Sequence, residues 1–309
     1  MEIVSVINYK GGVGKTTVTA NLAAYMAYQG KKVLLLDMDA QASLTFSFIS
    51  PDFWDNQLKN EKTIKKWFDC ISQGTPAIPL SQIIFEPEII NSHIRENGKT
   101  GKIALIASHL GLINVDLELA TLLGGASMEQ TKRKYIKVHG NLRKELKAIP
   151  NTNYDIILID CPPNFNIVTK NALVASDQIL VPAKPDYLST LGIEYLQRSV
   201  KSLISDYNDF SRGLEGETEI SPKILGVVFT MIQMYGNQPI QAQQQYIEQT
   251  RRLGIPIFNE YVRANNTIFA DAPQNGIPVV LNSYSNNSHS GNVFQITEFA
   301  KEFIKKVGI

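Results

Sequence analysis

Short runs of apolar residues recur along the chain, and stretches with helical spacing separate them. The runs cover residues 3–7, 33–36, 103–106, 156–159, 179–181, 224–229 and, more weakly, 257–262. Continuous apolar runs of this length are typical of strands that are buried on both faces of a parallel sheet. Their alternation with helices predicts an α/β fold, a doubly wound, mostly parallel sheet with helices on both faces. Ligands bind such sheets beyond the carboxyl ends of the strands.

Apolar positions three and four residues apart predict helices over 19–28, 133–149, 189–204 and 238–253. Residues 282–292 are rich in asparagine and serine, which predicts a loop before a last helix over 294–307. Segment 47–101 carries four prolines and fits one or two short helices at most. A prior of about 150 residues per domain allows two domains. We nevertheless expect a single domain, 1–309, with 47–101 as a poorly patterned insert.

The composition is that of an ordinary globular protein, with 44% apolar and 19% charged residues. A net charge of +1 gives no overall attraction to DNA or to acidic membranes, so any DNA affinity must come from a local patch. The two cysteines, Cys70 and Cys161, are far apart, which supports neither a disulfide framework nor a zinc site. With no basic leader and no apolar run of about 18 residues, we expect a cytoplasmic location.

One stretch carries a phosphate-binding motif. Residues 10–17 read Lys-Gly-Gly-Val-Gly-Lys-Thr-Thr and lie between the run 3–7 and the helix 19–28. A strand, then glycines, then Gly-Lys-Thr opening a helix is the context that a P-loop requires. Lys15 is then expected to reach the β and γ phosphates of a nucleotide, and the Thr16 hydroxyl to bind Mg²⁺. The alternative is a solvated turn with two lysines, and the flanking strand and helix disfavour it.

Carboxylates follow two other predicted strands. Asp37 and Asp39 come directly after the run 33–36, and Asp160 ends the run 154–160 in the form of a Walker B motif. Burying acids without a cation is costly, and Mg²⁺ bound to ATP would supply that cation. The alternative is a plain turn with solvated acids at the end of a strand. Beside the P-loop, the magnesium interpretation is favoured.

The loop departs from the general P-loop pattern, since Tyr9 stands where a glycine is usual and Lys10 follows it. A second lysine at this place marks the deviant Walker A loop, and the chain resembles the ParA/MinD family of partition and positioning ATPases. The resemblance also covers Asp37, Asp39 and Gln41 of switch I, whereas Ala40 stands where the family usually has proline. Switch II departs after Pro163, because Asn-Phe-Asn replaces the usual Ser-Leu-Gly.

The resemblance spans nearly the whole chain, most weakly in 47–101, and it implies roles for single residues. It implies that Lys10 crosses a dimer to meet the partner's ATP, that Asp39 activates the attacking water, and that Asp37 is mostly structural. The implied catalytic residues are Lys10, Lys15 and Asp39. The implied nucleotide contacts are Lys10, Gly11, Gly12, Val13, Gly14, Lys15, Thr16 and Thr17, with Met231 and Pro273 near the base. The implied metal site consists of Thr16, Asp39 and Asp160.

The same resemblance implies the cofactors ATP and Mg²⁺, an ATP-dependent homodimer and slow ATP hydrolysis that a ParB-like protein or cargo adaptor stimulates. It implies partition of a plasmid, a chromosome or another cargo by non-specific DNA binding. Arg251 and Arg252, which end the helix 238–253, are the candidate DNA contacts. Cations at a helix C-terminus are also favoured by the helix dipole alone, so this assignment has a plain alternative.

Two other classes of function stay open. In a MinD-like membrane-positioning ATPase, the helix 294–307 would lie on a membrane through Phe299, Phe303, Ile304 and Val307, although such a helix more often packs on the sheet. In a nucleotide-dependent scaffold that does not hydrolyse ATP, Asp39 would be inert.

Overall fold

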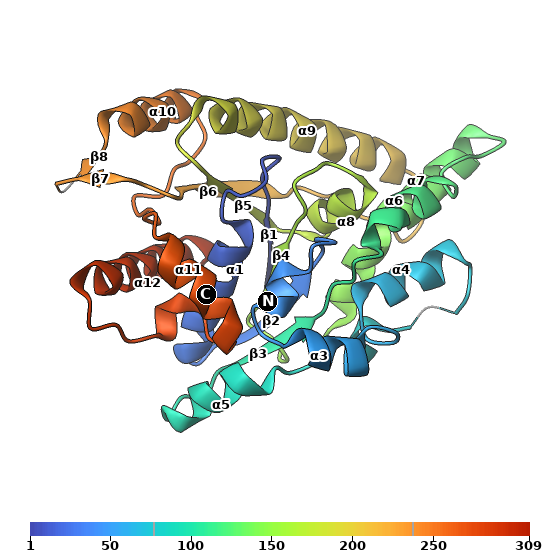
Figure 1. Cartoon of the computed structure of the whole chain (residues 1–309). Coiled ribbons are helices and arrows are strands. Elements are labelled where there is room, and N and C mark those ends of the chain that lie inside the picture. The colour runs from blue at the N-terminus through green and yellow to red at the C-terminus, as the bar shows by residue number, and fades with distance from the viewer. Residues whose placement is uncertain (77, 237) are drawn as a thin grey trace.

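The computed structural model describes residues 1–76, 78–236 and 238–309. Six parallel strands form one sheet in the order β3-β2-β4-β1-β5-β6 (Figure 1). The strands are β1 (Glu2–Val6), β2 (Lys32–Asp37), β3 (Lys102–Ile106), β4 (Ile156–Asp160), β5 (Gln178–Ala183) and β6 (Lys223–Phe229). The first six predicted strands are therefore confirmed, together with the parallel α/β fold.

Successive residues of each strand enter two different hydrophobic clusters, one on each face of the sheet. In β1, Ile3 belongs to one cluster and Val4 to the other. The helices on the Ile3 face are α4 (Ile64–Ser72), α6 (Leu112–Ala120), α7 (Met128–Ala148), α8 (Ile167–Ala175) and α9 (Tyr187–Ser211). Those on the Val4 face are α1 (Lys15–Tyr28), α5 (Glu88–Glu96), α11 (Asn266–Asp271) and α12 (Asn287–Val307). Helices thus cover both faces, as a doubly wound sheet requires.

The remaining elements are short or lie at the periphery. Helix α10 (Gln241–Arg252) lies beside α9 (Figure 1). The others are α2 (Ser43–Phe46), α3 (Pro51–Phe53), the π-helix η1 (Trp54–Leu58), the 3₁₀ turns η2 (Leu80–Gln82), η3 (Ala272–Asn275) and η4 (Val279–Leu281), and the antiparallel pair β7 (Met234–Tyr235) and β8 (Gln238–Pro239).

The predicted insert 47–101 protects the edge of the sheet; Ala77 within it lies outside the described residues. The side chain of Asn91 in α5 donates to the Ile103 carbonyl (2.8 Å) and accepts from the Ile103 amide (2.9 Å). It therefore satisfies backbone groups of the edge strand β3 that no further strand pairs. In α4, Trp67 and Phe68 are buried in the same cluster as the strands. This shared core supports the single-domain organisation, which stays a prediction.

The weak seventh strand, 257–262, was predicted wrongly. This segment follows the edge strand β6 but, among the described residues, makes one isolated bridge, between Val227 and Ile257. The amides of Asn259 and Glu260 donate to the Glu302 carboxylate of α12, each at 3.0 Å to Oε2. Because these amides are bound to a side chain, they cannot continue a ladder along β6.

The predicted helices are confirmed with shifted boundaries. Helix α10 begins at Gln241, since Gln238–Pro239 pairs with β7. Helix α12 begins at Asn287, inside the segment that was predicted to be a loop, because the Asn286 side chain caps it by accepting from the Ser288 amide at 2.8 Å. Helices α6 and α8 were not predicted.

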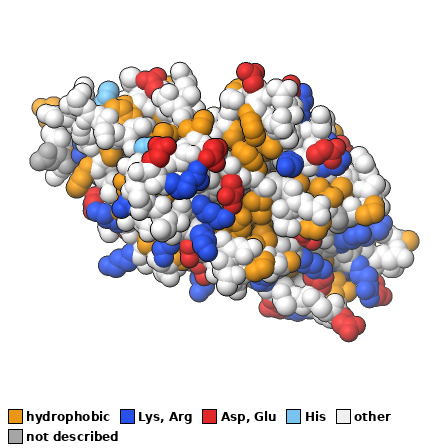
Figure 2. All heavy atoms as spheres, turned by 90° about the horizontal axis from the view of Figure 1, so that it is seen from below, with side chains coloured by type: hydrophobic (Ala, Val, Ile, Leu, Met, Phe, Trp, Pro, Cys, Tyr) orange, Lys and Arg blue, Asp and Glu red, His pale blue; other side chains and the backbone are white. Residues whose placement is uncertain are grey.

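The surface gives no large field of one charge on the face that Figure 2 shows, where basic and acidic side chains alternate with apolar ones. This agrees with the net charge of +1. Among the residues described, no helix is both long and apolar enough to cross a bilayer.

Candidate functional site

The candidate site lies where the central strands end. In the strand register, Val6 of β1 and Asp37 of β2 both stand opposite Asp160 of β4. The loop after β1, the acids after β2 and the acid that ends β4 therefore meet at one edge of the sheet. This is the edge at which doubly wound sheets bind ligands.

The loop between β1 and α1 adopts backbone conformations that favour glycine. Gly12 has φ of 67° and Gly14 has φ of 82°, and Gly14 is the N-cap of α1 without a side-chain cap. A β-carbon added at Gly14 would still lie 3.7 Å from Thr230, so backbone conformation and not space demands glycine there. The first amides of α1 receive no side-chain cap and are available to an anion.

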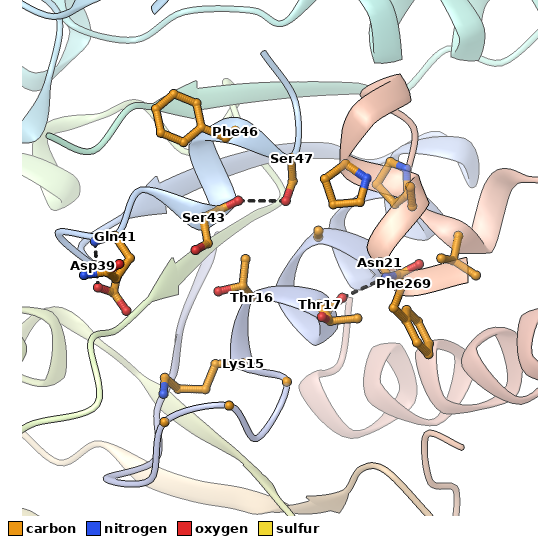
Figure 3. Close-up of a pocket in the computed structure, with 18 of the residues that line it drawn as sticks. Lys15, Thr16, Thr17, Asn21, Asp39, Gln41, Ser43, Phe46, Ser47 and Phe269 are labelled. Carbon is orange, nitrogen blue, oxygen red and sulfur yellow. Dashed lines mark hydrogen bonds between the residues drawn. The ribbon is translucent and has the colours of Figure 1, made fainter. Parts of the chain in front are cut away.

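A cavity of about 640 Å³ opens over this loop, a volume in the usual range for a small-molecule site. Lys15, Thr16 and Asp39 line one side of it, and Phe269 lies at the opposite side (Figure 3). The full lining comprises Gly11, Gly12, Gly14, Lys15, Thr16, Thr17, Ala20, Asn21, Asp39, Gln41, Ser43, Phe46, Ser47, Pro163, Met231, Phe269, Ala272, Pro273, Pro278 and Val279. The cavity thus combines a polar end with an apolar end, as a nucleotide requires.

Lys15 is a buried ammonium group without a carboxylate in hydrogen-bond contact. It is 7% exposed, and its Nζ donates to the backbone carbonyls of Asn8 and Lys10, each at 3.3 Å. Burial lowers the pKa of Lys15, although the nearby Asp160 opposes that shift. An anion in the cavity would compensate the buried charge.

Thr16 and Asp160 form a pair suited to a hydrated magnesium ion. The Thr16 hydroxyl donates to Asp160 Oδ2 at 2.6 Å. Asp160 is 1% exposed, and its Oδ1 is buried without a hydrogen-bond partner among the residues that the structure describes. Burial, helped by the nearby Asp37, raises the pKa of Asp160 well above its usual range. An orphaned carboxylate oxygen beside a hydroxyl fits Mg²⁺, which binds through few protein ligands together with water and phosphate oxygens.

In the part of the chain that the structure describes, no three His, Cys, Asp or Glu side chains form a cluster that could hold a metal.

The two acids after β2 differ in their surroundings. Asp37 is fully buried, its Oδ2 accepts from both the amide (2.8 Å) and the hydroxyl (2.7 Å) of Thr45, and burial raises its pKa to about 7. Asp39 lines the cavity, and its Oδ1 accepts from the Gln41 amide at 3.0 Å. This agrees with the structural role expected for Asp37 and leaves Asp39 as the acid that can meet a ligand.

The side chain of Lys10 is bound by a carboxylate outside the cavity. It does not line the cavity, and its Nζ lies 2.5 Å from Asp186 Oδ2. Asp186 is also the N-cap of α9, since its Oδ1 accepts from the Ser189 amide at 2.8 Å. Asp186 was not predicted as a site residue, although it lies just after β5, at the carboxyl edge of the sheet where site residues were expected.

Of the other predicted contacts, those for the base line the cavity and those for DNA do not. Met231 and Pro273 both line the cavity, and Val13 is buried with its carbonyl accepting from the Thr230 hydroxyl at 2.8 Å. Arg251 and Arg252 end α10, do not line the cavity and are exposed, and Arg251 pairs with Glu248.

Fold and site together define a P-loop nucleotide-binding protein. The family model AAA_31, described as an AAA domain, matches residues 1–211. The chain belongs to this family and is one of the ParA/MinD P-loop ATPases.

Known relatives match along almost the full chain. The sporulation initiation inhibitor protein Soj of Bacillus subtilis is 28% identical over 301 residues, which cover 97% of each chain. The chromosome-partitioning ATPase Soj of Treponema pallidum is 28% identical over 302 residues, covering 98% of this chain and 96% of the relative.

Solved structures share the fold at lower identity. An ATP complex of a McdA variant from Cyanothece has a TM-score of 0.70 and 20% identity, covering 100% of this chain and 97% of the other. A plasmid partition protein from Borrelia burgdorferi bound to AMPPNP has a TM-score of 0.66 and 19% identity, covering 99% of each chain.

Proposed function

We propose that this protein is a magnesium-dependent ATPase that dimerises when it binds ATP and drives the partition or positioning of DNA or another cargo. The observation that carries the proposal is the cavity in which Lys15, Thr16 and Asp39 face the apolar end at Phe269 and Pro273. The names of the curated relatives, which include a chromosome-partitioning ATPase, support the process. Met231 and Pro273 are the proposed base contacts.

The proposed chemistry is in-line attack of water on the γ phosphate. Asp39 would orient the water, and Lys15 would stabilise the charge that develops on the phosphoryl oxygens. Thr16 and Asp160 would hold the magnesium ion, and Asp39 would lie at the edge of the groups that surround it. When bound, that ion neutralises charge on the β and γ phosphates. The amides of Gly11 to Thr17, including Val13, would cradle the phosphates.

Lys10 would act on the nucleotide of a second subunit. Its side chain is 31% exposed and lies outside the cavity of its own chain, where Asp186 holds it. A cation at the edge of the loop can reach across to a partner's phosphates once it leaves that carboxylate. Hydrolysis would remove the γ phosphate, and with it the contacts that favour the dimer over the monomer. A ParB-like protein or cargo adaptor is the proposed activator.

The test of hydrolysis is phosphate release from Asp39→Ala compared with the wild type, with the exposed Asp52→Ala as a matched control. We expect Asp39→Ala to lose about a hundredfold in turnover while still binding ATP, and Asp52→Ala to behave as the wild type. Equal turnover of Asp39→Ala and the wild type would overturn the role of Asp39. Absence of turnover in the wild type would favour the nucleotide-dependent scaffold.

We also propose that Arg251 and Arg252 contribute to non-specific DNA binding by the ATP dimer. Both are exposed in the last turn of α10, which lies on the surface beside α9 (Figure 1). The helix dipole alone also favours cations there, so an experiment must separate the two explanations.

Packing of α12 disfavours the membrane-positioning alternative. Phe299, Phe303 and Val307 are at most 7% exposed and belong to the core on the α1 face, and Ile304, the fourth residue that would enter a membrane, is partly buried against the same core. Phe294 is exposed, but one aromatic ring gives little apolar area for membrane binding. Co-sedimentation of the ATP-bound full chain with acidic liposomes tests this, and we expect the protein to stay in the supernatant.

A further inference from the structure

The loop that carries Asp39 is attached to the end of a neighbouring strand. Ser108 follows β3, and its Oγ donates to the Asp39 carbonyl at 2.6 Å. Ser108 is fully buried, and this hydrogen bond is partly buried. The Asp39 carbonyl also accepts from the Ala42 amide at 2.9 Å, which closes the local turn. The turn from Asp39 to Ala42 is thus closed by its own hydrogen bond, and Ser108 adds a second hydrogen bond from outside this loop.

Thr45 connects the same serine to Asp37. The Thr45 hydroxyl donates to Asp37 Oδ2 at 2.7 Å and accepts from the Ser108 amide at 2.9 Å. Thr45 is fully buried as well. Ser108 thus binds both ends of the segment that leaves β2, at the Asp39 carbonyl through its hydroxyl and at Thr45 through its amide.

The backbone of Ser108 is itself fixed by the segment 47–101. Trp54 Nε1 donates to the Ser108 carbonyl at 3.0 Å. Trp54 is 5% exposed and packs edge to face against Phe46, with ring centroids 5.7 Å apart. Ser108 is therefore hydrogen-bonded through its carbonyl as well as through its amide and its hydroxyl.

We propose that Ser108 is a positioning residue for Asp39, supported by Thr45, and that it sets where the Asp39 carboxylate stands in the cavity. The Asp39 carboxylate accepts from the Gln41 amide in its own loop, so its position follows that of the loop backbone. The inference rests on the proposed role of Asp39 in ATP hydrolysis. Ser108 does not line the cavity, so it would act only through Asp39.

The first test is the steady-state kinetics of Ser108→Ala. We expect kcat for ATP hydrolysis to fall about tenfold or more, because small misplacements of a catalytic group are costly, and KM for ATP to stay within about twofold. Ser176→Ala is the matched control, since Ser176 is a buried, hydrogen-bonded serine just before the amino end of β5. An unchanged kcat, or equal losses in Ser108→Ala and Ser176→Ala, would overturn the proposal.

A double-mutant cycle separates this proposal from the proposed function. If Ser108 acts through Asp39, adding Ser108→Ala to Asp39→Ala lowers turnover no further. Additive losses would show that Ser108 acts elsewhere, while the role of Asp39 would stand. If Asp39→Ala alone retained wild-type turnover, the proposed function would fail whatever Ser108 does.

Two further measurements exclude a merely structural role. Thr45→Val should lower kcat as Ser108→Ala does, and Thr45→Ser, which keeps the hydroxyl, should restore most of it. Hydrogen–deuterium exchange without nucleotide should be faster in residues 38–46 of Ser108→Ala and unchanged in the P-loop. Equal exchange in that loop, or a failure of Thr45→Ser to restore turnover, would contradict the positioning role.

Discussion

The ammonium of Lys10 lies 2.5 Å from the carboxylate of Asp186 in the same chain. The two side chains are 31% and 39% exposed, and ion pairs at such sites contribute at most about 1 kcal/mol. In the proposed dimer, Lys10 would therefore exchange this partner for a phosphate of the second subunit at small cost. The ion pair with Asp186 gives the position of the Lys10 side chain in the single subunit.

Removing the charge of Asp186 should favour the dimer. In Asp186→Asn the α9 cap is retained, because asparagine is as good an N-cap as aspartate, while Lys10 loses its ion pair. With two such pairs per dimer, each worth up to about 1 kcal/mol, the dimer dissociation constant with ATP should fall by up to about 25-fold. Sedimentation equilibrium measures this.

Asp209→Asn is the matched control for that experiment, since Asp209 lies on the same helix and pairs with Arg212 at 3.0 Å. Its dimer affinity should equal that of the wild type. A weaker dimer in Asp186→Asn alone would mean that Asp186 is needed in the dimer itself.

Loss of the Thr16 hydroxyl should weaken ATP binding only when magnesium is present. The hydroxyl lies 2.6 Å from Asp160 at the proposed cation site. We expect Thr16→Ala to lose about tenfold or more in ATP affinity with Mg²⁺ and to match the wild type in EDTA. Isothermal titration calorimetry measures both, and Thr16→Ser should retain most of the affinity. Equal losses with and without Mg²⁺ would argue against a metal role for Thr16.

Arg251 and Arg252, at the end of α10, should contribute to the salt dependence of the affinity for DNA. Phosphate contacts release counterions, so the slope of log affinity against log salt should shrink by about 0.9 for each contact removed. We expect Arg251→Ala/Arg252→Ala to bind DNA more weakly in the presence of ATP, with a shallower slope. The pair Lys59→Ala/Lys62→Ala, on the surface near η1, serves as control. DNA binding without ATP, or unchanged in the arginine double variant, would refute this assignment.

The sequence predicts the strands and the phosphate loop because both depend on local patterns. Six apolar runs became the six strands, and Gly-Lys-Thr opens α1 at Lys15 as the motif requires. Motif residues such as Lys15 and Asp39 come together because parallel strands end at one edge.

The contacts that the sequence did not predict depend on packing between distant segments. Asp186 and Lys10 form an ion pair although they are 176 residues apart in the sequence. The sequence around neither residue indicates that the two would be in contact. The segment 257–262 looks like a strand by composition, yet Glu302 binds two of its amides from α12. Segment 47–101 has no clear period of apolar residues, because it consists of short elements that cover the edge of β3. No single helical or strand pattern therefore extends along it.

A buried histidine should make folding stability depend on pH. His139 is 1% exposed, its Nδ1 lies 3.0 Å from the Tyr135 carbonyl, and burial lowers its pKa from 6.5 to about 4. Between those values the unfolded chain binds more protons than the folded protein, so stability falls as pH drops from 6.5 towards 4. The full contribution is about 3 kcal/mol.

Urea unfolding of wild type and His139→Leu across this pH range isolates the effect. We expect the free energy of unfolding to fall less steeply with acidification in the variant, by about 3 kcal/mol over the whole window. His93→Leu, at a less buried position on α5, is the control and should keep the wild-type dependence. Parallel curves for wild type and His139→Leu would show that His139 is not the responsible group.

In the proposed dimer, Lys10 completes the ATP site of the second subunit. Sedimentation velocity with a non-hydrolysable ATP analogue and Mg²⁺ tests it directly, with the exposed Lys62→Ala as control. We expect a dimer for wild type and Lys62→Ala and a monomer for Lys10→Ala. A Lys10→Ala protein that sediments as the wild-type dimer would contradict it.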